Sequence, residues 1–396
     1  MQFDTCDTHQ HFRLEVPIRA ATSTTLLYAI FALSSRHLAI TSDYDDFACD
    51  RYHQDCLASL IPTLSDPNAV MNDSLLAAIV LLRTLEELSG KLFLIEYKPS
   101  SQRNFLMCKV IADNMYFFGL LSRHVQVLKD RLVPLVGVDY EKHLLGTQAF
   151  LNAADPAFHP SGLRTAAFRT GLRQDVWVAL LNHRPAQISP QHNTIDRVFS
   201  PADDGVWASR IVLICAEALQ WCFGEDDRTK ARYYDICNRY LQWLSLRPSS
   251  WEPFLYEAPD PSKGEVFPHI WHTQDCMVIG NHHHHLTSML LASYNPNIPR
   301  IGLRQKAALQ SIDKELCGHV TEMCGLALSN RKVVPAMMTA SVGVAMFGDR
   351  FSDLREQRAL LAVLEITEKE HGWPTSGAQV ALKETWDWNA DQSPPA

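Results

Sequence analysis

The sequence predicts an all-α fold in which stacked antiparallel helices form one large bundle or solenoid-like domain. Apolar residues recur at helical spacing through most of the 396-residue chain, and glycine, proline and asparagine interrupt the pattern where helices would end. Strand-like alternation is confined to short runs within residues 90–132. We therefore expect about nine to twelve helices packed as one body.

The first predicted helices occupy residues 24–40, 47–66 and 72–88. Each carries apolar residues on one face, as in TTLLYAIFALSSRHLAI at 24–40, so the three helices should stack against one another. No nucleophile elbow, phosphate-binding loop or set of metal-ligating residues lies among them. We expect this stretch to be a scaffold rather than a catalytic centre.

The later periodic segments predict further helices, with polar connections at residues 186–204 and 249–268. Gly224 and Asn330 mark helix ends, because both residue types are common at helix C-termini. The predicted helical segments are 133–153, 162–185, 204–224, 228–248, 270–296, 304–330, 335–348 and 353–373.

The composition argues against several functional classes. The net charge is −8 and Lys and Arg form no long run, which disfavours a surface that binds nucleic acid. A membrane-spanning helix needs about 18 or more consecutive apolar residues, and no such stretch occurs. The polar N-terminus also lacks the apolar region of a signal peptide. We expect no direct contact with nucleic acid or membrane.

The ten cysteines are scattered and form no Cys-x-x-Cys pair. Residues seven apart on a helix lie two turns apart, which separates their Cα atoms by roughly 10 Å. A disulfide requires Cα atoms within about 7 Å, so none can form within a helix. We expect buried free thiols in a reducing compartment. The pairs with this spacing are Cys49/Cys56, Cys215/Cys222 and Cys317/Cys324.

A series of short motifs runs through nearly the whole chain. It includes LLYAIFALSSRHLA (26–39), LLAAIVLLRTLEEL (75–88) and LRTAAFRTGLRQDVWVALLNHRP (163–185). In number, order and spacing, the motifs resemble the fungal-specific transcription factor domain, which is the regulatory region of Zn2Cys6 zinc-cluster transcription factors, in the branch of arginine-catabolism regulators. The other motifs lie at 52–66, 207–219, 240–254, 267–271, 324–330, 348–353, 356–364 and 371–375.

This resemblance implies a regulatory domain formed by residues 1–88 and 133–388, followed by a disordered tail at 389–396. It implies a homodimer, or a heterodimer with related regulators, that responds to a small-molecule effector. It also implies a location in the nucleus, or in the nucleus and cytoplasm. No cofactor is expected.

The chain departs from the family at its N-terminus. Family members normally begin with six cysteines in repeated Cys-x-x-Cys spacing, which hold two zinc ions on short helices, one of which enters the major groove. Here Cys6 and Cys49 are isolated. We therefore expect no DNA-binding cluster in this sequence. One interpretation is a truncated gene model in which Met1 is an internal start.

Residues 89–132 form a second departure, because the family has no counterpart for them. Gly90 and Lys91 would be encoded by GGTAAG, a common splice-donor sequence, and the residue mix differs from that of the neighbouring segments. We interpret this atypical insertion as an intron translated in frame. The alternative is a lineage-specific insertion folded on the surface. Full-length transcript sequencing separates the two interpretations.

The run of four histidines at 282–285 suggests a metal site. On a helix, His282 and His285 would share a face, and His269, His272 and Asp275 would form a second row nearby. A catalytic zinc needs three ligands and an open position, which these rows supply only if they converge. The resemblance instead implies a structural role, because family members carry a Gln-His pair at this point of a buried helix. We assign no metal-binding, cofactor-binding or catalytic residue.

Two further polar sets are candidates for ion pairs or for a polar pocket. We expect ordinary pairing on helix surfaces for both. Recurring tryptophans should fill gaps between helices rather than line a ligand cage. The polar sets are Arg83, Glu86 and Glu87, and Arg173, Asp175 and Trp177; the tryptophans are Trp207, Trp221, Trp243, Trp251 and Trp271.

The resemblance implies a transcription regulator of the zinc-cluster family that lacks its own DNA-binding cluster, and we favour this role over that of an enzyme. The alternative is a secondary-metabolism enzyme of cyclase or isomerase type, or a small-molecule-binding protein, built on the repurposed helical domain. Such a catalyst would need only an apolar pocket with one or two polar anchors. A pseudogene-like product without a stable function is the third interpretation.

Overall fold

The computed structural model describes residues 2–64, 66–88, 150, 162–188, 197–224, 228–299 and 301–388. The insertion at 89–132, the tail at 389–396 and the predicted helix at 133–153, apart from Phe150, lie outside these residues. The described part of the chain is all-α, with strands only in one two-stranded sheet, which confirms the predicted fold class. Its internal contacts divide the chain into two compact units, a division that the sequence did not predict.

The N-terminal unit comprises residues 7–175 and 187–194. In it α3 packs against both α4 and α5, as the apolar faces of these segments predicted. The Ser23 side chain caps α3 by accepting a hydrogen bond from the Leu26 amide. Two short helices, α1 and α2, escaped prediction because each is too short to show a period. The elements are α1 (His11–Leu14), α2 (Val16–Ala20), α3 (Thr24–Thr41), α4 (Ala48–Thr63), η1 (Pro67–Met71), α5 (Asp73–Leu88) and the first part of α9 (Leu163–Leu181).

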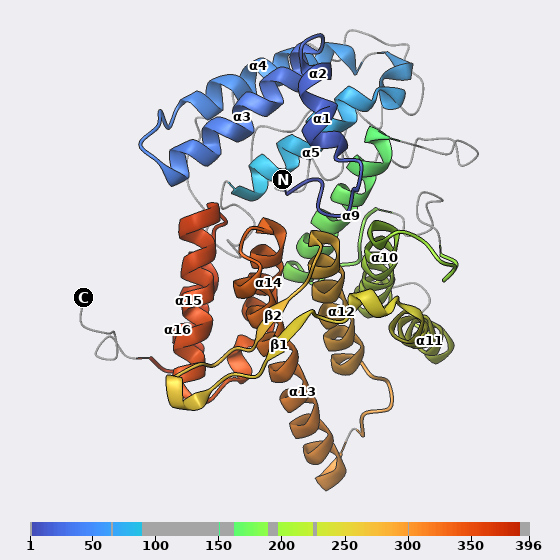
Figure 1. The fold of residues 1–396 in the computed structure, drawn as a ribbon, viewed down its shortest axis with the longest axis vertical. Coiled ribbons are helices and arrows are strands. Elements are labelled where there is room, and N and C mark those ends of the chain that lie inside the picture. The colour runs from blue at the N-terminus through green and yellow to red at the C-terminus, as the bar shows by residue number, and fades with distance from the viewer. Residues whose placement is uncertain are drawn as a thin grey trace. The chain divides into compact units, whose positions relative to one another are not determined.

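The C-terminal unit comprises residues 1–6, 176–186 and 195–396. Its helices pack mostly beside their neighbours in sequence: α10 against α11 and α12, α12 against α13, α13 against α14, and α14 against α15 (Figure 1). The elements are α10 (Asp204–Phe223), α11 (Lys230–Leu246), η2 (Ser249–Trp251), β1 (Leu255–Glu257), η3 (Pro261–Lys263), β2 (His269–Trp271), α12 (Asp275–Ser293), α13 (Gly302–Ser329), α14 (Val334–Phe347), η4 (Gly348–Arg350), α15 (Leu354–His371), α16 (Ser376–Thr385) and the end of α9.

The small sheet corrects the prediction for residues 249–296. Strands β1 and β2 pair antiparallel, and α12 begins only at Asp275 rather than at Ile270. The Ile270 amide donates to Ser329 Oγ at 3.0 Å, and its carbonyl accepts from Asn330 Nδ2 at 2.8 Å. These partners hold Ile270 in an extended conformation although they lie far away in sequence. Asn330 also ends α13, as predicted.

Tryptophans fix the spacing of helices in the C-terminal unit. Trp207, Trp243 and Trp251 are almost completely buried, and the Trp243 indole donates to the Trp207 carbonyl at 3.0 Å. Trp251 packs so closely on α12 that a Cβ at Gly280 would lie 2.5 Å from a ring carbon. The predicted role of these three residues as fillers between helices is confirmed, whereas Trp271 is 41% exposed.

Helix α10 is the one described helix that is long and apolar enough to cross a membrane, judged by length and composition. Most of it, 83% of the apolar window, is buried inside the fold. A core helix passes the same test, so the result is weak evidence for a membrane span.

Candidate functional site

A buried polar cluster lies in the N-terminal unit, on α5 and the first part of α9. Arg83, Thr84 and Glu87 come from α5, and Gln174 comes from α9; each is at most 3% exposed. Arg83 Nε lies 3.3 Å from Glu87 Oε1, one helical turn away, and Gln174 Nε2 donates to Thr84 Oγ1 at 2.7 Å. The cluster therefore joins two helices that are about 90 residues apart in sequence.

The burial of this cluster corrects the expectation of surface pairing. Helix α5 is buried nearly all round, from Leu75 to Leu85 and again at Glu87, so its charged residues have little access to water. Within the set of Arg83, Glu86 and Glu87, Glu86 alone keeps partial exposure, with 21% of its side chain accessible, and it pairs with Arg83 Nη1 at 3.1 Å. The sequence spacing of an ion pair is the same on a buried face and on an exposed one, so spacing alone could not distinguish them.

Glu87 is the most perturbed group of the cluster. Burial raises the pKa of its carboxyl to about 7, although the Arg83 charge and the nearby Gln174 amide both act to lower it. Neither carboxyl oxygen of Glu87 makes a well-aligned hydrogen bond within the described residues. A carboxyl in this state can bind a cation, accept a hydrogen bond from a ligand or exchange a proton near neutral pH.

The second predicted polar set separates into individual structural roles. Asp175 is fully buried, and its Oδ2 accepts from the Gln187 and Ile188 amides at 2.6 and 2.7 Å, which fixes the chain after α9. The Trp177 indole donates to Thr339 Oγ1 of α14 at 3.1 Å. These partners are backbone amides and a hydroxyl, so the expected surface pairing is wrong for both residues.

The four histidines lie on α12, and each has a different environment. His282 and His283 are fully buried, and His283 Nδ1 bonds the Ile279 carbonyl at 2.8 Å. Burial lowers the pKa of His282 to about 3, and neither of its ring nitrogens has a hydrogen-bond partner in the described part of the chain. His284 stacks on Tyr240, whose hydroxyl lies 2.8 Å from its Nδ1.

The two candidate rows of metal ligands do not converge within the described residues. His285 Nδ1 lies 2.9 Å from Nδ1 of His319 on α13, and His272 Nε2 lies 3.2 Å from Asn281 Nδ2. His269 belongs to β2, so the second row is not helical. Within the described residues, no three His, Cys, Asp or Glu side chains are placed to hold a metal ion.

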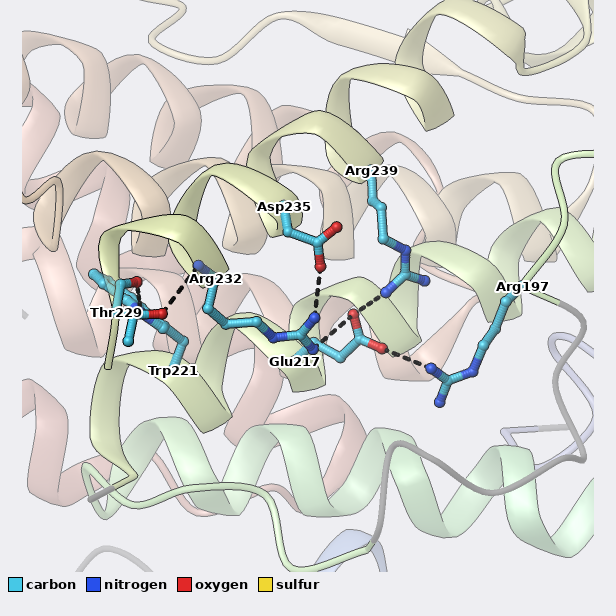
Figure 2. Close-up of polar contacts among 7 residues, drawn as sticks. All are labelled: Arg197, Glu217, Trp221, Thr229, Arg232, Asp235 and Arg239. Atoms are coloured by element: carbon cyan, nitrogen blue, oxygen red, sulfur yellow. Dashed lines mark hydrogen bonds and ion pairs between the residues drawn. The ribbon is translucent and has the colours of Figure 1, made fainter. Parts of the chain in front are cut away.

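Sequence analysis missed Thr84, Gln174 and a further buried carboxylate, Glu217. Thr84 and Gln174 carry no pattern that distinguishes them from surface residues. Glu217 stands within the apolar stretch LICAEALQW of α10, and an isolated acid in such a stretch was a usable signal. In the structure three arginines surround it (Figure 2).

Comparisons of the chain with models of protein families, with curated proteins and with solved structures find no match. The resemblance of the motifs to a family therefore stays a hypothesis.

Proposed function

We propose that this chain is the regulatory, effector-sensing domain of a transcription regulator of the fungal zinc-cluster family, and that its sequence holds no DNA-binding cluster. The order and spacing of the motifs, including those at 26–39, 75–88 and 163–185, support this assignment. The all-α fold is compatible with it.

The buried cluster of Arg83, Glu87, Thr84 and Gln174 is the observation that carries the sensing role. Burying an ion pair is often no better for stability than burying apolar side chains of similar size, so stability alone does not explain it. The cluster lies on α5 and α9, the helices of two of the motifs. A small polar effector that bonds the Glu87 carboxyl would change the packing of these two helices.

The proposed regulator acts in the nucleus, or in the nucleus and cytoplasm, as a homodimer or as a heterodimer with related regulators. Its contact with DNA would come from such a partner rather than from these 396 residues. It needs no cofactor and no membrane.

A reporter assay tests the proposal. The whole chain is fused to an unrelated DNA-binding domain in a fungal host, and transcription from its target promoter is measured. The fusion should change transcription several-fold, and Glu87→Gln should alter that response while Glu86→Gln, on the same helix, does not. Unchanged transcription from a soluble, nuclear fusion would contradict the proposal.

An enzyme of cyclase or isomerase type, or a small-molecule-binding protein, is the second candidate, and one observation favours it. A carboxyl whose pKa is about 7 is suited to general acid–base catalysis at neutral pH, and Glu87 has that property. Turnover of a pathway intermediate by the purified chain, lost in Glu87→Gln, would establish this alternative.

A further inference from the structure

Two histidines join α12 to α13 in the C-terminal unit. His285 Nδ1 lies 2.9 Å from His319 Nδ1, and the centroids of the two rings are 5.2 Å apart. The residues are 34 positions apart in sequence, and the packing of α12 against α13 brings them together. We call these two residues the histidine pair.

The separation of the two nitrogens fits neighbouring ligands of one metal ion. Imidazole nitrogens bind first-row divalent metals at about 2.0–2.1 Å, so two that meet at a right angle lie roughly 2.9 Å apart. Square-planar and tetragonal Cu²⁺ sites have this angle, whereas tetrahedral Zn²⁺ needs a separation of roughly 3.3 Å. The observed 2.9 Å therefore favours a tetragonal ion.

Glu315 favours the tautomer of His319 that a metal needs. Its Oε1 lies 3.8 Å from His319 Nε2, one helical turn away on α13. A carboxylate beside one ring nitrogen favours the proton there, which leaves the lone pair of Nδ1 free. His285 Nδ1 is then the donor in the metal-free pair, and His319 Nδ1 is the acceptor. A carboxylate behind a ligating histidine is a common feature of metal sites.

The surroundings of the histidine pair admit a cation. The side chain of His319 is 19% exposed and that of Glu315 is 49% exposed, so an ion can reach the pair from solvent. The positive charge of Arg247 also acts on His285, but Arg247 pairs with Glu252 at 3.0 Å. The carboxylate of Glu315 adds a negative charge beside the site.

The site has two protein ligands, and water would fill the other positions. The ring of His284 lies 4.8 Å from that of His285, but its Nδ1 is 2.8 Å from the Tyr240 hydroxyl. His284 is therefore held by another partner. A two-histidine site agrees with the finding that, within the described part of the chain, no three ligating side chains converge.

We propose that the histidine pair binds a divalent copper ion through His285 Nδ1 and His319 Nδ1. Among first-row divalent ions, Cu²⁺ binds nitrogen sites most tightly. Binding replaces the hydrogen bond between the rings with two metal–nitrogen bonds, after the rings rotate and the His285 proton moves from Nδ1 to Nε2. The ion would link α12 to α13. This site is independent of the proposed function, which needs no metal.

Titration of the full chain with Cu²⁺ tests the proposal. The wild type should bind one more equivalent of Cu²⁺ tightly than His319→Gln does. At one equivalent, the electron paramagnetic resonance spectrum of the wild type should show coupling to two nitrogens. The matched control is His37→Gln, which removes an exposed histidine of α3 and should keep the tight site.

Glu315→Gln provides a variant that leaves both ligands in place, and its side chain is exposed enough to be replaced without loss of the fold. It should weaken Cu²⁺ binding by about 10- to 100-fold, as expected for the partner of a ligating histidine. Cu²⁺ should also raise the Tm of the wild type more than that of His319→Gln. Equal binding by the wild type, His319→Gln and Glu315→Gln would mean adventitious copper only and would overturn the proposal. The absence of a tight site in the wild type would overturn it as well.

Discussion

Arg83 and Glu87 lie one turn apart on α5 with 3.3 Å between Nε and Oε1, and both side chains are shielded from water. The pair is held inside a helix that is itself almost entirely buried. Arg83 also pairs with Glu86, whereas Glu87 depends on Arg83 for compensation of its charge. The stability of the N-terminal unit should therefore respond when Arg83 is removed.

Replacing Arg83 by methionine should destabilise the N-terminal unit by about 3 kcal/mol at pH 8, because it leaves the Glu87 charge buried without its partner. The loss should be smaller at pH 6, where Glu87, whose pKa burial already raises to about 7, takes up a proton. Urea unfolding at the two pH values measures both effects. Equal losses at pH 8 and pH 6 would contradict the assignment of Glu87 as the group left unpaired.

Gly280→Ala should destabilise the C-terminal unit by about 1–3 kcal/mol, since the added Cβ would lie 2.5 Å from the Trp251 ring. Gly318 on α13 provides the matched control, because a Cβ there meets nothing within 4 Å. Gly318→Ala should stabilise by up to about 1 kcal/mol through helix propensity. Thermal unfolding of the two variants measures the difference, and a similar Tm for both would refute the close packing of α12 on Trp251.

Acid should destabilise the C-terminal unit through its buried histidines. Burial lowers the pKa of His282 and His284 to about 3 and that of His272 to about 4. The unfolded chain therefore binds more protons below its ordinary histidine pKa of about 6.5. Their stabilising contribution is complete above that pH and is lost as the pH falls toward the folded values.

His282 is fully buried, so it should lower the free energy of unfolding by roughly 1.4 kcal/mol for each pH unit below pH 6.5. The half-buried His284 and His272 should each lower it by less. Unfolding of the chain between pH 8 and pH 5, followed by tryptophan fluorescence, measures the slope. His284→Phe keeps a ring beside Tyr240 but cannot titrate, so its slope should be smaller. Equal slopes in the wild type and in His284→Phe would contradict the burial of His284 in the neutral form.

The cysteines should react slowly in the native protein. All nine described cysteines are free, and burial raises the pKa of Cys56 to about 12 and that of Cys49 to about 11. The thiolate is the reactive form, so it is scarce at neutral pH. Peptide mapping after brief alkylation should show the half-buried Cys237 and Cys317 labelled first. Rapid labelling of Cys56 would contradict the packing of α3 on α4.

Local periodicity was enough to predict the helices that pack through one apolar stripe, such as α3 and α4. It could not predict β2, because the groups that hold Ile270 extended, Ser329 and Asn330, are about 60 residues away. A helical pattern continued across Ile270 in the sequence, and these distant partners overrode it.

Spacing also identified Arg83 and Glu87 as a pair without revealing that they are buried. An ion pair one turn apart has the same pattern on either face of a helix, and only the residues packed around α5 decide its environment. Glu217 was detectable as an isolated acid in an apolar stretch, but the arginines that surround it come from two other segments. Their convergence depends on the packing of α10 against α11.

Transcript profiling of the source organism tests the central claim most directly. The gene is deleted or replaced by Glu87→Gln or Glu86→Gln, and transcripts and pathway intermediates are measured in the same cultures. If the chain is a regulator, the transcript levels of one common set of genes should change in the deletion strain and in the Glu87→Gln strain. The Glu86→Gln strain should match the wild type. Unchanged transcripts together with an accumulated intermediate would contradict the regulatory function and favour an enzyme.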